Sequence, residues 1–208
     1  YAVNVNMSLY LVTSEKKMIS FKETLEHGIK LTTTEVDTCR FSPKGISDFI
    51  NENEEIIPYR LFEEIRRYIQ RFIVLKDEHA YLFLALWAMG TYLFRVFRYF
   101  PYVHLNGEKQ SGKTLLMEVL EPLCFNGQLS VNSTEAVLFR DVQNNSLTLL
   151  LYEFEKFIKE DRERYGAVMD ILKTGFQKSG RVKRCGGKNK DKIHSFSTYS
   201  PKMLAGIN

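Results

Sequence analysis

Eight consecutive residues carry the strongest chemical signal in this sequence. They are Gly107, Glu108, Lys109, Gln110, Ser111, Gly112, Lys113 and Thr114, which fit the pattern G-x-x-x-x-G-K-[ST] at every defined position. The glycines let backbone N–H groups curl around a phosphate, and the first-turn N–H groups of a following helix have no partner within that helix. Lys113 would reach the β- and γ-phosphates of a nucleotide, and Thr114 would ligate Mg²⁺. We therefore expect a nucleoside triphosphate to bind here; the alternative is a chance glycine turn before an amphipathic helix.

Two glutamates follow the apolar run 147–152, which is typical of a buried strand. A nucleoside triphosphatase needs carboxylates there, one to hold Mg²⁺ through water and one to position the attacking water. Glu153 stands in the place of the water-activating base and could also serve the metal, and Glu155 projects to the same side if the strand continues. Tyr152 stands where an aspartate is expected, and a neutral phenol with a pKa of about 10 is a poor outer-shell magnesium ligand. The alternative for both glutamates is a solvated strand end.

Positive charge concentrates near the end of the sequence. The whole chain has a net charge of +4, but the stretch 173–202 contains nine Lys or Arg residues and a single Asp. Two short strands, Arg181–Cys185 and Ile193–Thr198, flank a Gly-rich tip and predict a hairpin. We expect this hairpin to bind nucleic acid phosphates, and the alternative is a solubilising edge hairpin whose lysines block strand pairing. The residues expected to contact DNA are Arg181, Lys183, Arg184, Lys188, Lys190 and Lys192.

Strands and helices alternate around these motifs. The predicted strands are 102–106, 129–131, 147–152 and 202–207, and the predicted helices are 112–120, 133–142 and 165–176. Such alternation is typical of a parallel sheet covered by helices on both faces. The expected fold class is therefore α/β, with the phosphate loop directly after the first strand of the core.

Two helices are predicted before this core. Pro58 suits the first turn of a helix, and apolar residues at helical spacing extend the pattern to Leu75. Asp77 can cap the next helix, Glu78–Tyr99, which is apolar nearly all round and should be buried on most faces. We assign its aromatic residues to the core rather than to a surface that stacks nucleic acid bases.

The first 55 residues predict a small β-rich appendage. Apolar and polar residues alternate from Val3 to Leu9, which is the pattern of a half-buried strand. Further short strands are expected at 17–21 and 31–41, and a short helix at 45–53. The predicted organisation is an appendage (1–55), a helical segment (56–100) and a phosphate-loop core (101–208).

Composition excludes several classes of protein. The chain has 208 residues, 44% hydrophobic and 26% charged, with 12 Gly and 5 Pro, which excludes a disordered or collagen-like chain. Three cysteines without a C-x-x-C pair form neither a disulfide framework nor a zinc site, and they favour a cytoplasmic location. The longest uncharged apolar run, Ala80–Phe94, has 15 residues, whereas a membrane-spanning helix needs about 20, so no membrane partner is expected. Because the sequence opens at Tyr1 without a signal peptide, we expect a segment of a longer protein.

In this order, the motifs resemble the AAA+-type ATPase core of helicases and replication proteins from bacterial mobile elements and phages, a group related to the MCM and superfamily 3 helicases. The resemblance covers residues 58–208. It rests on the stretches DEHAYLFLALWAMGTYLF, FPYVHLNGEKQSGKT, NSTEAVLFRDVQNNSLTLLLYEFEKF and SGRVKRCGGKNKDKIHSFSTYSPKMLAGIN. Only the phosphate loop is a specific motif by itself. The order and spacing of the other stretches make the resemblance closer than that of a generic P-loop protein.

The resemblance implies a role for each motif. Lys113 and Thr114 would bind ATP and Mg²⁺, and Glu153 would be the catalytic glutamate. Asn208 would sense the γ-phosphate from the tip of a strand that lies beside the acidic strand. The hairpin would face the central channel of a homo-oligomer, a hexameric ring, and contact single-stranded DNA there. An arginine from the neighbouring subunit would complete each active site, and a helical lid would follow Asn208.

These implications predict an ATP-binding and ATP-hydrolysing DNA helicase or replication-initiator domain. Because Tyr152 replaces the expected aspartate, the alternative is a nucleotide-dependent DNA-binding switch with little or no hydrolysis. A small-molecule kinase could use the same loop, but the sequence has no evident acceptor pocket and the basic stretch would have no use. Tyr152 is the residue that discriminates between hydrolysis and switching.

Overall fold

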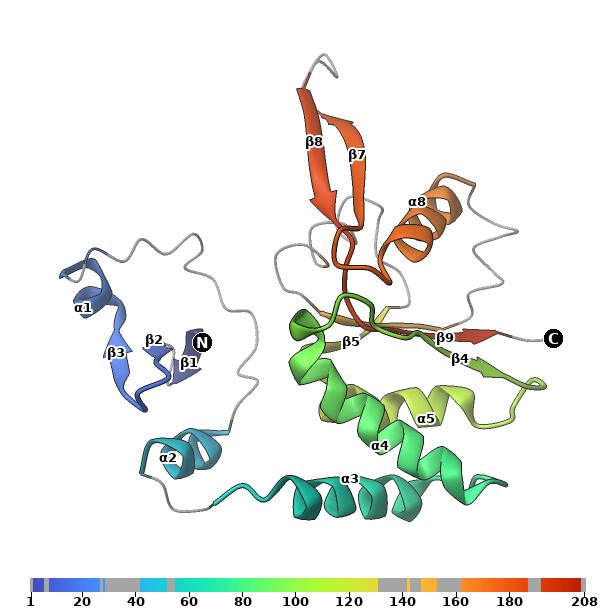
Figure 1. Cartoon of the computed structure of the whole chain (residues 1–208), viewed down its shortest axis with the longest axis horizontal. Coiled ribbons are helices and arrows are strands. Elements are labelled where there is room, and N and C mark those ends of the chain that lie inside the picture. Colours follow the sequence, from blue (N-terminus) through green and yellow to red (C-terminus); the bar gives the residue numbers. More distant parts are fainter. Residues whose placement is uncertain are drawn as a thin grey trace. The chain divides into compact units, whose positions relative to one another are not determined.

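The computed structural model describes residues 2–5, 8–26, 28, 42–51, 55–130, 142, 147–152, 162–186 and 192–206. The chain divides into two units, Tyr1–Ile57 and Pro58–Asn208. Figure 1 labels the elements of both units.

Among its described residues, the first unit forms an antiparallel sheet and two helices. The strands are β1 (Ala2–Val5), β2 (Ser8–Val12) and β3 (Met18–Ser20), in the order β1-β2-β3, and the helices are α1 (Phe21–Glu26) and α2 (Pro43–Asn51). The prediction of one strand from Val3 to Leu9 is wrong, because the chain reverses and Val5 pairs with Ser8. Alternation indicates extended backbone but not where it turns back. The strand predicted at 31–41 lies outside the described residues.

Helix α1 follows β3 directly and was not predicted. Ser20 and Glu23 form a capping box at its start: Ser20 Oγ accepts a bond from the Glu23 N–H at 3.3 Å, and the Glu23 carboxylate accepts one from the Ser20 N–H at 2.7 Å. These two bonds satisfy N–H groups that a helix start otherwise leaves unpaired. The pattern S-x-x-E thus marks the point where strand gives way to helix.

A parallel sheet forms the centre of the second unit. Its strands are β4 (Val103–Asn106), β5 (Gly127–Ser130), β6 (Thr148–Leu151) and β9 (Lys202–Gly206), in the spatial order β4-β9-β6-β5 (Figure 1). The predicted α/β class with a parallel sheet is confirmed. Strand β9 comes last in the sequence but lies between β4 and β6, with Gly206 paired to Asn106 and Leu204 paired to Leu151.

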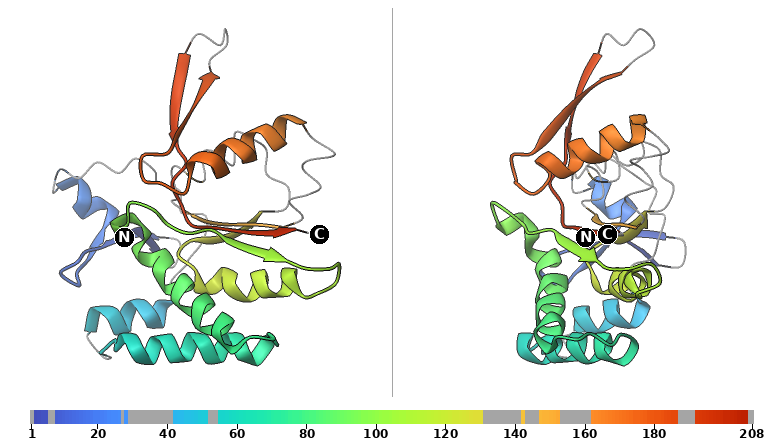
Figure 2. Two further views of the ribbon diagram at one scale, coloured as in Figure 1. Left: turned by 45° about the vertical axis from the view of Figure 1, so that its right-hand side comes forward. Right: turned by 90° about the vertical axis from the view of Figure 1, so that its right-hand side faces the viewer.

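Helices cover both faces of this sheet. Helices α4 (Glu78–Leu93) and α5 (Lys113–Leu120) lie against one face, α3 (Pro58–Phe72) packs on them, and α8 (Arg162–Thr174) covers the other face (Figure 2). Strand β6 is buried on both sides: Leu150 enters the core on the α5 side, whereas Leu149 and Leu151 enter the core on the α8 side. Burial on both faces explains why β6 carries three consecutive leucines, 149–151, instead of alternating apolar and polar residues. Apart from Val142, the helix predicted at 133–142 lies outside the described residues.

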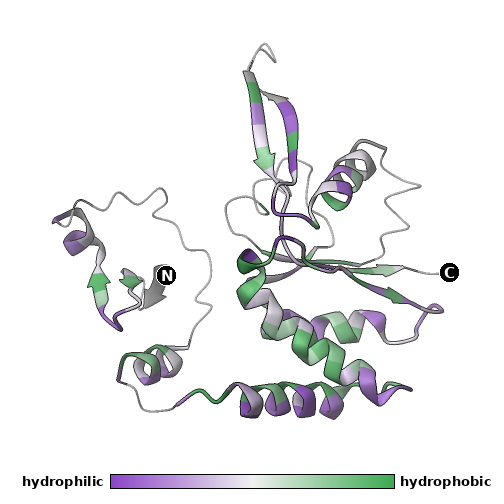
Figure 3. Ribbon diagram, viewed as in Figure 1, coloured by the Kyte–Doolittle hydropathy of each residue, from purple (hydrophilic) through white to green (hydrophobic). Residues whose placement is uncertain are grey.

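Helix α4 differs from its prediction in length and in burial. Asp77 caps it as predicted, accepting a bond from the His79 N–H at 2.9 Å. The helix ends at Leu93 rather than at 99, and a 3₁₀ turn, η1 (Phe94–Val96), follows. The prediction of burial on most faces is wrong, because Phe83, Leu86 and Leu93 are 49%, 58% and 58% exposed. In Figure 3 this helix is largely coloured as hydrophobic, whereas α3 alternates between hydrophobic and hydrophilic residues.

Two shorter features complete the second unit. A second 3₁₀ turn, η2 (Glu121–Leu123), leads from α5 to β5, and an antiparallel hairpin of β7 (Arg181–Gly186) and β8 (Lys192–Ser197) precedes β9. No helix in the described ranges is both long and apolar enough to cross a membrane.

Lys202, the first residue of β9, is fully buried. Its Nζ donates to the carbonyl oxygens of Thr198 and Ser200, both at 2.9 Å, and to Ser200 Oγ at 3.1 Å, and it lies 5.1 Å from the centre of the Tyr102 ring. Burial lowers the pKa of this ammonium. Counting Lys202 among the surface charges of the stretch 173–202 was therefore wrong. Its buried hydrogen bonds hold the segment that follows the hairpin against the sheet.

Replacing Lys202 should cost stability. The variant Lys202→Met keeps much of the buried volume but leaves the carbonyl oxygens of Thr198 and Ser200 without this donor. We expect the free energy of unfolding to fall by about 2 to 4 kcal/mol. Chemical denaturation measures this, with Lys76→Met at an exposed lysine as the control. Equal stability of Lys202→Met and the wild type would contradict the role of Lys202 as a tie.

Candidate nucleotide-binding site and basic hairpin

The phosphate loop joins the end of β4 to the start of α5. Helix α5 begins at Lys113, and Gly112 is its N-cap with a φ of +83°, in the left-handed region that glycine adopts without strain. Gln110 also has a positive φ of 63°, so the chain turns sharply just before the helix. Because glycine has no side chain, no side-chain hydrogen bond caps the first turn of α5. Its N–H groups are therefore suited to bind an anion.

The side chain of Lys113 folds back over this loop. Its Nζ donates to the carbonyl oxygens of Gly107 and Glu108, at 2.7 and 2.6 Å, and to Ser111 Oγ at 3.2 Å. These bonds hold a positive charge inside the curve of the loop, next to the uncapped helix start. The loop itself is open to solvent, since Glu108, Lys109, Gln110 and Ser111 are exposed. A phosphate could therefore meet both the backbone N–H groups and the ammonium.

Thr114, in the first turn of α5, is half-buried. Its hydroxyl follows the lysine in the same turn of helix, where it would meet a metal ion bound to the phosphates. The residues present thus fit a nucleotide with Mg²⁺, because the loop offers an uncapped helix start, a held cation and a hydroxyl in one place.

The carboxyl ends of three strands meet at the edge where this loop lies. Strands β4, β6 and β9 are parallel and adjacent, so their last residues, Asn106, Leu151 and Gly206, lie at one edge of the sheet. The expectation that the strand before Asn208 lies beside the acidic strand is confirmed, because β9 pairs with β6. Glu153, Glu155 and Asn208 themselves lie outside the described residues. Ligands of open α/β sheets typically bind at this edge.

Tyr152, directly after β6, is half-buried and packs against the core on the α5 side of the sheet, as Leu150 does. An apolar contact is thus made at the position where an aspartate is expected from the sequence. In the described part of the chain, no three or more His, Cys, Asp or Glu side chains gather as a metal-binding group. From this part of the chain, the hydroxyl of Thr114 is the metal ligand that the loop offers.

The predicted hairpin is confirmed, with each strand close to its expected bounds. Strands β7 and β8 pair from Arg181 with Ser197 to Gly186 with Lys192, and the hairpin projects away from the sheet (Figure 1). Val182 packs against the core on the α8 side. Residues on the opposite face of β7, Arg181 and Lys183, are exposed.

The basic residues of the hairpin have different surroundings. Arg184 Nη2 forms an ion pair with Asp170 Oδ2 of α8 at 2.7 Å, so its charge is partly neutralised and holds the hairpin to that helix. No sequence pattern pointed to Asp170, which is 14 residues away from Arg184. Lys188 and Lys190 lie outside the described residues, and Lys192 is the first residue of β8. Arg181 and Lys183 are thus the described cations that remain available at the surface of β7.

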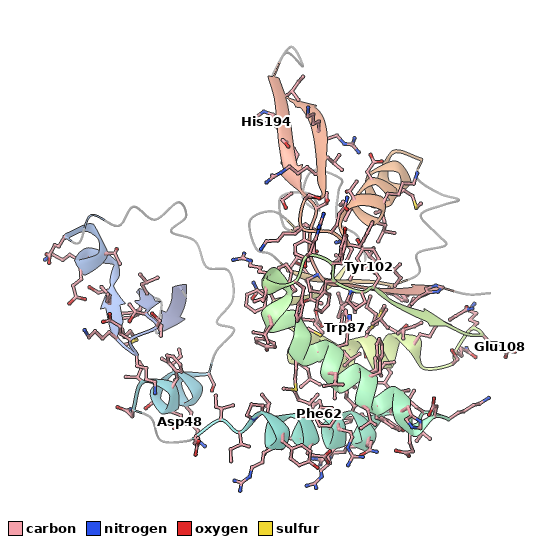
Figure 4. All side chains as sticks on the ribbon, in the orientation of Figure 1. Asp48, Phe62, Trp87, Tyr102, Glu108 and His194 are labelled. Atoms are coloured by element: carbon pink, nitrogen blue, oxygen red, sulfur yellow. The ribbon has the colours of Figure 1, made fainter. Side chains whose placement is uncertain are left out.

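The structure does not bring the loop and the hairpin together. The loop follows the carboxyl end of β4, whereas the hairpin precedes the amino end of β9, so the two lie at opposite edges of the same sheet. Figure 4 labels Glu108 in the loop and His194 on the hairpin, and the two are widely separated. Strand β9 follows the hairpin and leads from that edge to the edge where the loop lies.

In comparisons with known proteins, no family model and no curated protein sequence matches the chain. The functional interpretation therefore depends on the loop, the sheet and the hairpin described above.

Proposed function

We propose that this chain binds ATP and Mg²⁺ through residues 107–114 and uses ATP to act on DNA, as a helicase or replication-initiator domain of a mobile element or phage. The observation that carries the proposal is the strand-loop-helix unit in which Gly112 leaves the start of α5 uncapped and Lys113 lies across the loop. The resemblance of the ordered motifs to AAA+-type helicase cores supports the choice of ATP and DNA.

In this proposal each residue has a separate task. The loop N–H groups and Lys113 would hold the phosphates, and Thr114 would hold Mg²⁺, which would supply charge neutralisation. Glu153 takes the proton of the attacking water, and Asn208 contacts the γ-phosphate. Their strands end at the edge where the loop lies, as a reaction at the γ-phosphate requires. A ring of identical subunits, with an arginine from the neighbour, would complete the site.

DNA is the proposed partner of the hairpin. Arg181 and Lys183 are exposed on one face of β7, opposite the face that packs toward α8. Cations on a projecting hairpin contact the sugar-phosphate backbone and carry no base preference. A helicase separates the two strands of a duplex, so we propose that the channel of the ring holds single-stranded DNA.

A second function is favoured by Tyr152. Because its ring packs against the core on the α5 side, the site has a phenol where a magnesium-orienting carboxylate is expected. ATP would then bind and organise the subunits on DNA, while hydrolysis stays slow. In this alternative the chain is a nucleotide-dependent DNA-binding switch.

Loss of the loop lysine should abolish ATP binding. In Lys113→Ala the ammonium that meets the phosphates is gone, while the core is untouched because, within the described ranges, the side chain bonds to the loop's own atoms. We expect ATP with Mg²⁺ to raise the melting temperature of the wild type and of a Lys76→Ala control, but not of Lys113→Ala. Equal ATP-induced stabilisation of all three proteins would show that the loop is not the site.

Neutralising the exposed face of the hairpin should weaken DNA binding regardless of sequence. In Arg181→Gln with Lys183→Gln, two phosphate contacts are lost, so the slope of log K against log salt for single-stranded DNA should become shallower by about 1.4. The matched control removes the same charge from exposed residues outside the hairpin, Arg60→Gln with Lys76→Gln. If both double variants keep the wild-type slope, the hairpin is a solubilising edge instead.

Restoring a carboxylate after β6 should raise ATP turnover if the missing aspartate limits hydrolysis. We expect Tyr152→Asp to increase turnover by about 10- to 100-fold, the usual effect of a charged partner of a metal site. Adding Glu153→Gln should remove the gain. Tyr152→Phe is the control, because it keeps the ring without adding charge. Brisk turnover by the wild type would exclude the switch, and no gain in a longer protein that includes the lid would place the defect elsewhere.

A further inference from the structure

Two aromatic rings stack on the surface of the second unit, away from the phosphate loop. Tyr99 precedes β4 and Phe176 follows α8, and their ring centres are 6.1 Å apart with an angle of 17° between the planes. The two residues are 53% and 40% exposed. Assigning the aromatic residues of the stretch 78–99 to the core was therefore wrong for Tyr99, because the helix ends before it and the chain runs along the surface.

The backbone holds this ring pair in place. Tyr99 and Gln177 form an antiparallel bridge. On either side of it, the Phe100 N–H donates to Phe176 O and the Lys178 N–H donates to Arg98 O, both at 2.9 Å. The rings thus sit on two paired segments rather than on separate loops, and they need little ordering before a ligand binds.

Positive charge surrounds the ring pair. The Arg98 guanidinium lies 5.5 Å from the centre of the Tyr99 ring, and Lys178 Nζ donates to Arg95 O at 2.7 Å. The segments 94–102 and 173–183 together contain six Lys or Arg residues and no Asp or Glu, whereas Arg184, the next residue, is paired with Asp170. A ligand of this surface should therefore be a polyanion that also offers flat apolar faces.

We propose that the Tyr99–Phe176 pair, together with Arg98, stacks the unpaired bases of single-stranded DNA beside the base of the hairpin. This inference rests on the proposed DNA-binding function and adds a second kind of contact to it. Exposed rings with an adjacent arginine are the combination that binds single strands, because every base has a π-face and every nucleotide a phosphate. In a duplex those faces are already stacked, so the site selects single-stranded DNA.

The ring pair and the hairpin are positioned to act on one strand. Lys178 and Arg181 are separated by two residues, and both are exposed. The segment that carries Phe176 continues directly into β7, where Arg181 and Lys183 face solvent. The phosphates of a strand can follow the hairpin cations while its bases lie on the rings.

Paired oligonucleotides separate base stacking from phosphate contact. One is an oligothymidylate, and the other has the same length and charge but abasic sugars. The wild type should bind the oligothymidylate more tightly. In Tyr99→Ala with Phe176→Ala, affinity for the oligothymidylate should fall by about 5- to 150-fold, as expected for one stacked base, while affinity for the abasic strand and the salt slope stay the same.

Two controls keep the test specific. Tyr99→Trp retains a flat ring and should bind like the wild type, and Tyr59→Ala removes a still more exposed tyrosine from α3 and should change nothing. Irradiation of an oligonucleotide that contains 5-iododeoxyuridine should attach it to peptides that include Tyr99 or Phe176. This measurement uses the wild type and so does not depend on how the variants fold.

The outcomes distinguish this site from the proposed function. Equal binding of both strands by the wild type, or an unchanged affinity of the double alanine variant, would overturn the stacking site and leave DNA binding intact; the ring pair would then suit a protein partner. An equal loss of affinity for the oligothymidylate and for the abasic strand in the double alanine variant would also overturn the stacking site. If the wild type binds neither strand, the DNA-binding function and the stacking site both fall.

Discussion

Hydrogen bonds on both sides of β9 hold the second unit together. Strand β9 pairs with β4 through Gly206 and Asn106 and with β6 through Leu204 and Leu151. It also joins the two cores, since Met203 and Ala205 face the α5 side while Leu204 faces the α8 side. The phosphate loop and the ends of β6 and β9 share an edge only because β9 completes the sheet between its neighbours.

The two edges of the sheet offer different chemistry. At the carboxyl edge, the loop relies mainly on backbone N–H groups, with the Lys113 ammonium held by its own carbonyl oxygens. At the amino edge, the groups that the hairpin and the stacked rings offer to a ligand are side chains of Arg, Lys, Tyr and Phe. Backbone groups fix the geometry of a small ligand closely, whereas flexible cations follow a long polyanion of any sequence. This division agrees with the proposal that the loop binds one defined nucleotide and the hairpin a DNA strand of any sequence.

The features that could be predicted are those encoded by neighbouring residues. The loop 107–114 is a local motif, β6 lies in a leucine-rich run, and the hairpin shows as two short strand-like stretches around a Gly-rich tip, so each could be placed from the sequence. The burial of Lys202 and the exposure of Leu86 could not, because both depend on which elements pack nearby. The ion pair between Arg184 and Asp170 likewise requires the packing of β7 on α8, which no local pattern encodes.

The short length of β9 has a mechanical consequence. Five residues of extended strand span about 17 Å, and such a strand is close to inextensible. A one-residue slip would turn its side chains to the wrong cores, so β9 cannot slide between its neighbours by small steps. Lys202 anchors the segment that leads into β9 from the hairpin. The base of the hairpin is therefore coupled to the sheet, and a rotation of the sheet would carry the hairpin base through the same angle.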